Sequence, residues 1–211
     1  MEPKSGNYEK YMNSNPLMQR AIAGFLGSVE SLTASLNVGT ILDAGCGEGF
    51  VSRRLGNKAL IGMDISSSAL NIAKQNNPDA VLVQGSIYDM PFKQESFDLV
   101  MATEVLEHLK EPEKAMLELS RLSRRYCLFS VPNEPYFRII DLFRGKNVLR
   151  LGSDIEHVHN WSERRFVELA SKHFDVVKTR SPFPWTVVLC QKRPFEYSHG
   201  VEPRPSESGL L

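Results

Sequence analysis

A glycine-rich loop flanked by two aspartates is the part of this sequence with the clearest capacity for chemistry. The loop, Gly45–Gly49, has glycine at every second position and follows an apolar run, Thr40–Ala44, which predicts a buried parallel strand. Because glycine lacks a Cβ and tolerates positive φ, such a loop can turn sharply and lie directly against a ligand. Asp43 precedes the loop, and Asp64 closes the next apolar run, where a carboxylate can hold both hydroxyls of a ribose. This order predicts a nucleotide-shaped pocket.

The spacing of the loop separates two kinds of nucleotide ligand. Dinucleotide sites use G-x-G-x-x-G and bring a helix N-terminus to a pyrophosphate. Here the third glycine, Gly49, comes one residue earlier than in that motif. Asp43 also places a carboxylate just before the loop, and its negative charge would repel a pyrophosphate. An anion suits instead a ligand that carries an ammonium and a sulfonium, as S-adenosyl-L-methionine does. The spacing therefore disfavours a nicotinamide oxidoreductase. The remaining alternative is that the loop is an ordinary glycine-rich turn that binds no ligand.

Five blocks of the sequence, in order, resemble the class I S-adenosylmethionine-dependent methyltransferases of the type 11 group. The resemblance runs from about residue 40 to residue 192. It implies S-adenosyl-L-methionine as the cofactor and methyl transfer as the activity. The blocks are Leu42–Gly49, Gly62–Ser66, Gln84–Ser86 with Met90–Phe92, Ser96–Val100 and Glu104–Leu109.

The resemblance also implies which residues bind the cofactor. Asp64 would bind the ribose, and Ile65 would lie against the adenine. Related enzymes often carry an aspartate after the residue equivalent to Gly85, but this chain has Ser86, whose hydroxyl is a weaker acceptor. We therefore expect the Ile87 backbone to share in adenine recognition. The predicted cofactor-binding residues are Asp43, Gly45, Gly47, Asp64, Ile65, Ser86, Ile87 and Thr103.

The segment Glu104–His108, with the spacing E-x-x-E-H, holds the predicted catalytic residues. We predict that Glu104 faces the methionine end or the acceptor, and that His108 lines the acceptor pocket as a general base. A divalent metal is the interpretation we favour less. If the segment is helical, Glu104, Glu107 and His108 share one face and could hold the ion. A similar arrangement binds metal in small-RNA 2′-O-methyltransferases and some quinone-biosynthesis O-methyltransferases, and His157 is the nearest match to the further histidine of the RNA enzymes.

The elements that must position these residues alternate along the chain. Strands are predicted at 40–44, 58–63, 80–83, 97–102 and 125–131, with helices at 49–55, 67–76 and 111–124. After a helix from residue 161 to about 172, strands at 174–179 and 185–191 predict a hairpin. The fold class is therefore α/β, with a Rossmann-like seven-stranded sheet, mostly parallel with one antiparallel strand, and helices on both faces.

Length predicts one domain, because 211 residues suffice for a single core. The first 13 residues are expected to be a mobile segment. Within them, Tyr8 and Tyr11 either fold over the cofactor as a lid or lie on the surface. The predicted divisions are a methyltransferase domain over 1–192, with an N-terminal lid and helix at 1–36 and a substrate-side insert at 132–160, and a flexible tail at 193–211.

The insert contains a basic, apolar stretch. Residues 136–150 carry four basic side chains and one acidic side chain among mostly apolar residues. Such a segment can lie on a membrane surface, cover the acceptor as a lid, or pack on the domain with its arginines solvated. It favours a hydrophobic or anionic small-molecule acceptor.

The composition indicates which classes of partner the protein can bind and in which cellular compartment it works. Lys plus Arg and Asp plus Glu number 25 each, which argues against a general nucleic-acid surface. Three widely spaced cysteines are typical of reduced thiols, and neither a signal peptide nor an apolar run long enough to span a bilayer is apparent. We therefore expect a cytoplasmic protein. Methyl transfer to a small hydrophobic acceptor, most favourably at oxygen, is the leading hypothesis. The alternatives are a non-catalytic cofactor-binding regulator and a metal-assisted 2′-O-methyltransferase of RNA.

Overall fold

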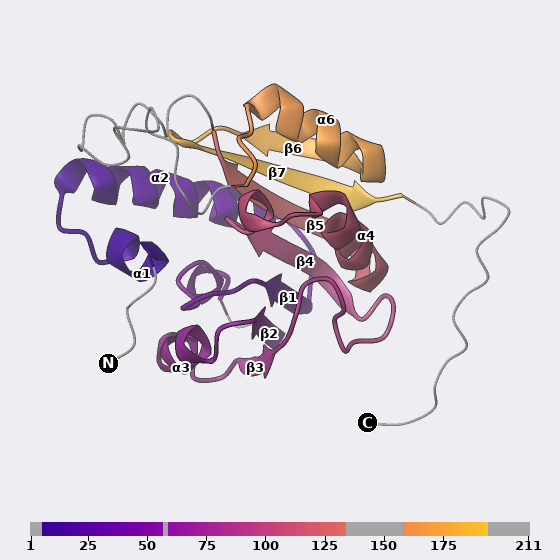
Figure 1. Cartoon of the computed structure of the whole chain (residues 1–211), viewed down its shortest axis with the longest axis horizontal. Coiled ribbons are helices and arrows are strands. Elements are labelled where there is room, and N and C mark those ends of the chain that lie inside the picture. Colours follow the sequence, from indigo (N-terminus) through magenta and orange to yellow (C-terminus); the bar gives the residue numbers. More distant parts are fainter. Residues whose placement is uncertain (1–5, 57–58, 134–157, 194–211) are drawn as a thin grey trace, which may run out of the picture.

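The computed structural model describes residues 6–56, 59–133 and 158–193. Within these residues seven strands form one sheet: β1 Thr40–Ala44, β2 Ala59–Asp64, β3 Val81–Gln84, β4 Phe97–Thr103, β5 Ser123–Pro132, β6 Phe174–Arg180 and β7 Trp185–Lys192. Their order across the sheet is β3-β2-β1-β4-β5-β7-β6 (Figure 1). The neighbours from β3 to β5 pair in parallel, whereas β7 is antiparallel to both β5 and β6. This arrangement confirms the predicted fold class, including the antiparallel strand from a C-terminal hairpin.

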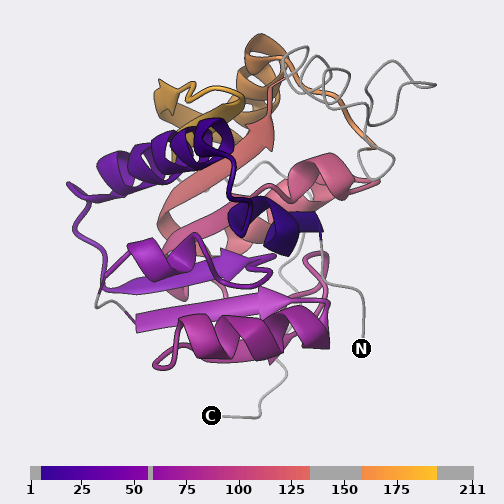
Figure 2. The ribbon, with the colours of Figure 1, turned by 90° about the vertical axis from the view of Figure 1, so that its left-hand side faces the viewer.

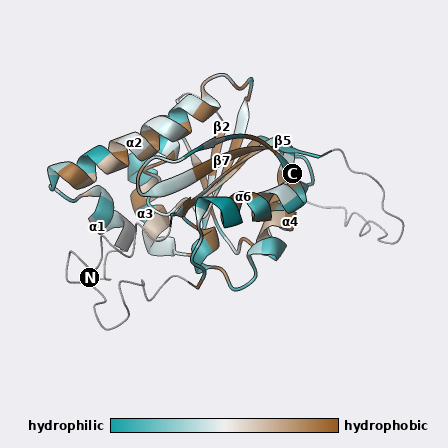
Figure 3. Cartoon of the chain, turned by 90° about the horizontal axis from the view of Figure 1, so that it is seen from above, coloured by the Kyte–Doolittle hydropathy of each residue, from teal (hydrophilic) through white to brown (hydrophobic). Residues whose placement is uncertain are grey.

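Helices cover both faces of this sheet (Figures 1 and 2). In central strands, successive side chains enter different cores, as expected for strands buried on both faces. Ile41 joins a core that includes the inner side of α2, whereas Leu42 and Ala44 join the core under α4 and α6. Hydrophobic residues run along the central strands, while much of α6 is hydrophilic (Figure 3). The helices are α1 Gly6–Tyr11, α2 Pro16–Thr33, α3 Ser67–Asn76, α4 Pro112–Leu122 and α6 Glu163–His173.

The helix α2 has a well-defined start and one strong anchor on the sheet. Asn15 caps it, because its side-chain oxygen accepts a hydrogen bond from the Leu17 N–H at 2.9 Å, and Pro16 occupies the first turn. On its inner side, the ring of Phe25 packs against that of Trp185, with 5.0 Å between the centroids, and both side chains are buried. The N-terminal part of the chain is thereby fixed next to the start of β7.

Two local predictions differ from the structure. The helix expected at 49–55 is only a 3-10 turn at Ser52–Arg54, because Gly49 and Gly56 on either side of it adopt positive φ. Residues 6–11, expected to belong to a mobile segment, form α1. The stretch 136–150, His157 and the tail beyond residue 193 lie outside the described residues. None of the helices in the described ranges has the length and apolar character needed to cross a bilayer.

One carboxylate joins β1 to β4 at the sheet edge opposite the glycine loop. Asp98 Oδ2 accepts hydrogen bonds from the backbone N–H groups of Gly39 and Thr40 at 2.9 and 3.0 Å, and Arg124 donates to Oδ1 at 2.5 Å. These bonds, led by the one from Gly39, lower the pKa of Asp98 to about 2. The carboxylate thus fixes the start of the strand that leads into the loop.

We expect Asp98→Asn to lower the free energy of unfolding by about 2 kcal/mol at pH 7. Because the folded-state pKa lies below the value of 3.8 for a free side chain, this contribution is present above pH 4. It is lost as the pH falls toward 2. Urea unfolding of both proteins at several pH values measures the difference. Asp175→Asn, which removes an exposed pair with Arg193, is the control and should change little. A loss for Asp98→Asn that stays constant down to pH 2.5 would contradict this account.

Candidate cofactor and active site

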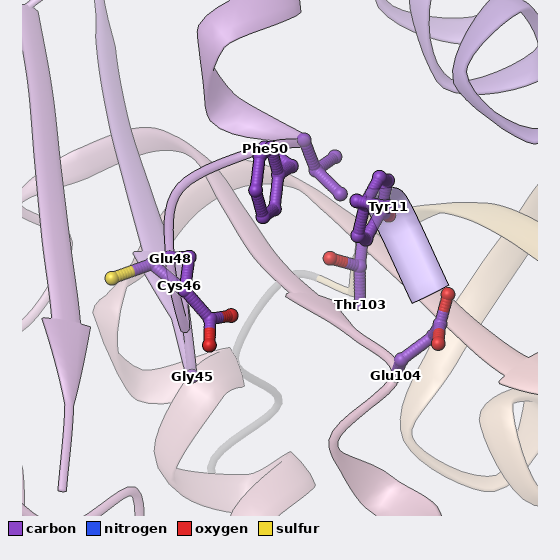
Figure 4. Close-up of a pocket in the computed structure, with 8 residues that line it drawn as sticks. Tyr11, Gly45, Cys46, Glu48, Phe50, Thr103 and Glu104 are labelled. Atoms are coloured by element: carbon purple, nitrogen blue, oxygen red, sulfur yellow. The ribbon is translucent and has the colours of Figure 1, made fainter. Parts of the chain in front are cut away.

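A pocket lies at the carboxyl ends of β1 and β4, where ligands bind in open α/β sheets. The glycine loop forms one wall, the residues after β4 form another, and Tyr11 at the end of α1 completes the lining (Figure 4). The cavity volume is about 20 Å³, which is enough for roughly one water molecule. The lining residues are Tyr11, Gly45, Cys46, Glu48, Phe50, Val51, Thr103 and Glu104.

Gly45 is required by the geometry of the loop. Its φ is 78°, and a Cβ at this position would come within 2.4 Å of Val105. The N–H groups of Gly45 and Cys46 both donate to the Met63 carbonyl, at 2.7 and 3.0 Å. The loop therefore turns tightly against the end of β2 and leaves its backbone open toward the pocket.

Asp64 ties the loop to the next helix. Its Oδ2 accepts from the Gly47 N–H at 2.8 Å, and its Oδ1 accepts from the Ser66 N–H at 2.9 Å, just before α3 begins. A carboxylate has about four acceptor positions, so each oxygen keeps one for a ligand. The neighbouring Ile65 side chain is 74% exposed, an apolar surface beside this carboxylate that a flat base could cover. The pair has the chemistry predicted for ribose and adenine binding.

Asp43 lies buried under the loop and does not line the pocket directly. The Ser52 hydroxyl donates to its Oδ2 at 2.5 Å, while Oδ1 has no hydrogen-bond partner among the described residues. Burial raises the pKa of Asp43 to about 6; the Ser52 bond lowers it and the charge of Asp64 adds to the rise. A buried carboxylate of this kind gains most from a nearby cation.

The other predicted cofactor residues fall into two groups. Thr103, at the end of β4, lines the pocket together with Gly45. Ser86 and Ile87 follow β3, at the same edge of the sheet, but are not among the pocket-lining residues. The Ser86 hydroxyl accepts from the Tyr88 N–H at 3.3 Å, and Ile87 is buried in the core. Their predicted contacts with adenine stay predictions.

Glu104 stands in a strained position at the end of β4. Its φ is 56°, which is uncommon for any residue other than glycine. Its N–H donates to the Ser130 carbonyl at 3.0 Å, which holds the turn in place. The carboxylate lies in the pocket wall, where Oε2 pairs with the ammonium of Lys10 and Oε1 has no partner among the described residues.

The E-x-x-E-H residues do not share one face. Only Leu106–His108 is helical, as a 3-10 turn, and Glu104 precedes it with a left-handed backbone. Glu107 is buried with neither side-chain oxygen partnered among the described residues, whereas His108 is exposed. Burial, with the charge of Glu104 as the next cause, raises the pKa of Glu107. The metal hypothesis required a helix that puts Glu104, Glu107 and His108 on one face, and the segment does not form that helix. Across the described ranges, no group of three or more potential metal-ligating side chains is found.

Several residues that shape the site were missing from the predicted set. Glu48 and Phe50 line the pocket next to the glycines, so their place in the loop was a usable signal. Tyr11, expected as a lid or a surface residue, stacks on Phe50 with 4.6 Å between ring centroids. Lys10 had no sequence signal, because its partner Glu104 is 94 positions away.

A family model described as "Methyltransferase domain" matches residues 42–129 of this chain, from β1 to β5. The match covers less than half of the chain, and over this part the sequence is similar to methyltransferases. Magnesium protoporphyrin IX methyltransferase from Synechocystis PCC 6803 shares this methyltransferase fold. That structure, solved with bound SAH, has a TM-score of 0.67 and 17% identity, over 90% of this chain and 96% of that chain.

Sequence relatives include two ubiquinone biosynthesis O-methyltransferases. The mitochondrial protein of Candida albicans is 32% identical over 53% of this chain and 38% of that protein. The protein of Hydrogenovibrio crunogenus is 26% identical over 74% of this chain and 66% of that protein. The chain spans about half or less of several other relatives, down to 21% of a bifunctional biotin biosynthesis protein from Cellvibrio japonicus.

The buried carboxyl group of Asp43 makes the stability of the protein depend on pH. Since its folded-state pKa of about 6 lies above the free value of 3.8, its contribution is full below pH 4 and declines as the pH rises through 6. In Asp43→Asn this decline should be absent, so that at pH 8 the variant gains up to roughly 2–3 kcal/mol relative to the wild type. Urea unfolding of the cofactor-free proteins from pH 4 to 8 measures it. Asp79→Asn, at an exposed position, should follow the wild type, and an Asp43→Asn curve that does the same would refute the assignment.

Proposed function

We propose that this chain binds S-adenosyl-L-methionine and transfers its methyl group to a small, hydrophobic acceptor, most favourably at oxygen. The observation that carries the proposal is a pair of buried carboxylate oxygens, Asp43 Oδ1 under the glycine loop and Glu104 Oε1 in the other wall of the pocket. Both lack a hydrogen-bond partner among the described residues. Buried acidic groups in this condition favour a cationic ligand.

The chain's own groups fit such a ligand along its length. Asp64 keeps acceptor positions for the two ribose hydroxyls and stands beside the exposed Ile65. The absence of a Cβ at Gly45 lets the loop pack against Val105, and Gly45 itself lines the pocket. Glu104 provides negative charge across the pocket from the glycine loop (Figure 4). When bound, the cofactor supplies the activated methyl group, and the protein supplies binding, orientation and electrostatics.

A second pocket, lined in part by Trp185, supports an acceptor site. Asn133, Glu163, Ser181, Phe183, Pro184 and Trp185 line it. Trp185 connects it to the first pocket, because the Lys10 ammonium lies 5.6 Å from the centroid of the Trp185 ring and also pairs with Glu104. Aromatic and proline side chains beside three polar ones suit an apolar molecule with a few polar groups.

The names of the relatives support a quinone-like acceptor and oxygen as the methylated atom. Two are ubiquinone biosynthesis O-methyltransferases. A demethylmenaquinone methyltransferase from Renibacterium salmoninarum is 30% identical over 40% of this chain. In this scheme His108, exposed four residues after the pocket-lining Glu104, takes the proton from the acceptor hydroxyl, and Glu104 positions the reacting groups.

The cysteines support a reducing compartment for this reaction. Cys46, Cys127 and Cys190 are all free thiols, and the last two are buried in the sheet. Burial raises the pKa of Cys127 to about 12. We place the proposed enzyme in the cytoplasm.

Asp64→Ala should weaken the binding of S-adenosyl-L-methionine by more than tenfold, because it removes both the ribose acceptor and the bond that holds Gly47. Calorimetry on the purified proteins measures the dissociation constants. Asp79→Ala, exposed after the far end of α3, is the matched control and should bind like the wild type. Equal affinity in Asp64→Ala and the wild type would falsify the pocket assignment.

The enzyme is incubated with S-adenosyl-L-methionine that carries a labelled methyl group and with candidate acceptors: phenols of the quinone-precursor type, amines and carbanion-forming acids. We expect the label to be transferred to the phenols. His108→Asn should reduce this turnover by roughly 10²–10⁴ and leave cofactor affinity unchanged, because the side chain lies outside the cofactor pocket. Mass spectrometry of the products identifies the methylated atom. Methyl transfer only to nitrogen or carbon, or full turnover in His108→Asn, would contradict the oxygen assignment.

A further inference from the structure

We propose that α1 is an autoinhibitory gate over the cofactor pocket, in which the Lys10 ammonium takes the place of the cofactor's own α-ammonium at Glu104. Cofactor binding would then displace Lys10 and move α1 away from the pocket. The inference rests on the proposed function, because it names the same ligand. It adds a competition within the chain that the family fold does not require.

The contact between Lys10 and Glu104 is a buried ion pair. The side chains of Lys10 and Glu104 are 13% and 9% exposed. The same ammonium lies over the rings of Tyr11 and Trp185, at 5.2 and 5.6 Å from their centroids. A cation enclosed by a carboxylate and two aromatic rings is held firmly. This position of Lys10 makes a positive charge part of the pocket wall before any ligand enters.

A positive charge is also what the proposed ligand brings to this place. Glu104 lines the pocket across from the glycine loop (Figure 4), and Asp64 is bonded to that loop at Gly47. If Asp64 holds the ribose, the amino-acid part of the ligand would reach toward Glu104. Two ammonium groups at one carboxylate repel each other, and the enclosed surroundings strengthen that repulsion. The ligand and Lys10 therefore compete for Glu104.

Space gives a second, independent reason for the gate. Tyr11 lines the pocket and stacks on Phe50, with an angle of 19° between the rings (Figure 4). The remaining cavity of about 20 Å³ admits roughly one water molecule. Tyr11 on Phe50 therefore takes up space that a nucleoside joined to an amino acid would need.

The helix α1 is built so that it can leave. It has six residues, and so short a helix is unstable without tertiary contacts. It joins α2 through a short connection, where Gln19 Nε2 donates to the carbonyls of Tyr11 and Asn13 at 3.3 and 2.5 Å. Contacts that hold α1 over the pocket include the ion pair, the Lys10 ammonium over the Trp185 ring, and the rings of Tyr8 and Tyr11 against Phe50. Two of these contacts belong to Lys10, so loss of its ammonium should loosen the helix.

Lys10→Met tests the competition. We expect it to bind S-adenosylhomocysteine at least about fivefold more tightly than the wild type in calorimetry, because Glu104 is then open to the ligand. Lys10→Arg, which keeps the charge, should bind like the wild type. Lys114→Met removes an exposed pair with Glu111 and serves as the control for loss of a lysine. Unchanged or weaker binding by Lys10→Met would overturn the gate, and weaker binding would assign Lys10 to the ligand's carboxylate instead.

Hydrogen–deuterium exchange of the peptide that contains residues 6–12 gives a readout apart from affinity. Its exchange should be faster in Lys10→Met than in the wild type, and faster in the wild type when S-adenosylhomocysteine is added. Exchange that slows on ligand addition would overturn the gate, since it would show α1 closing on the ligand. If neither the wild type nor Lys10→Met binds S-adenosylhomocysteine, the proposed function fails together with the gate. If the wild type binds and Lys10→Met binds equally, the gate alone fails.

Discussion

The arrangement of the site depends on the carboxylate of Asp64, which connects the glycine loop to the start of α3. This carboxylate accepts one hydrogen bond from the glycine loop, at Gly47, and one from Ser66 at the start of α3. The loop is fixed from the other side by the Met63 carbonyl, which accepts from Gly45 and Cys46. With both bonds in place, the end of β2 holds the loop, the helix start and two free acceptor positions in one rigid unit. A ligand that binds there meets a preformed surface.

Negative charge is the second constraint on the site. Asp43, Glu104 and Glu107 are all largely buried, and each has at least one carboxylate oxygen without a partner among the described residues. Such groups cost stability unless they are protonated or meet a cation. Lys10 meets part of this need at Glu104. The same electrostatic demand that favours a cationic cofactor thus also explains why the chain places its own ammonium in the pocket.

The fold was largely predictable because its local signals agree with one another. The strand at Thr40–Ala44 and the helix at Ser67–Asn76 have the predicted bounds, since a continuous apolar run and the serine cap at Ser66 mark them directly. The turn at Ser52–Arg54 was predicted as a helix because periodicity does not report the positive φ of the flanking glycines.

The site was predictable only where its residues are close in sequence. Gly45 and Asp64 follow from the loop and the strand end. Lys10 does not, because its position at Glu104 depends on how α1 and α2 pack on the finished sheet. Likewise, the buried side chain of Glu107 and the exposed one of His108 follow from the left-handed turn at Glu104, which the sequence spacing alone does not reveal.

The central claim is that the pocket recognises an adenosyl sulfonium or its thioether product and rejects a dinucleotide. Calorimetric titration of the unmodified protein with S-adenosyl-L-methionine, S-adenosylhomocysteine and NADH tests it most directly. The account predicts saturable binding of the first two ligands and no heat beyond dilution with NADH. Binding of NADH in preference to either adenosyl ligand would contradict it, and so would the absence of binding by both adenosyl ligands.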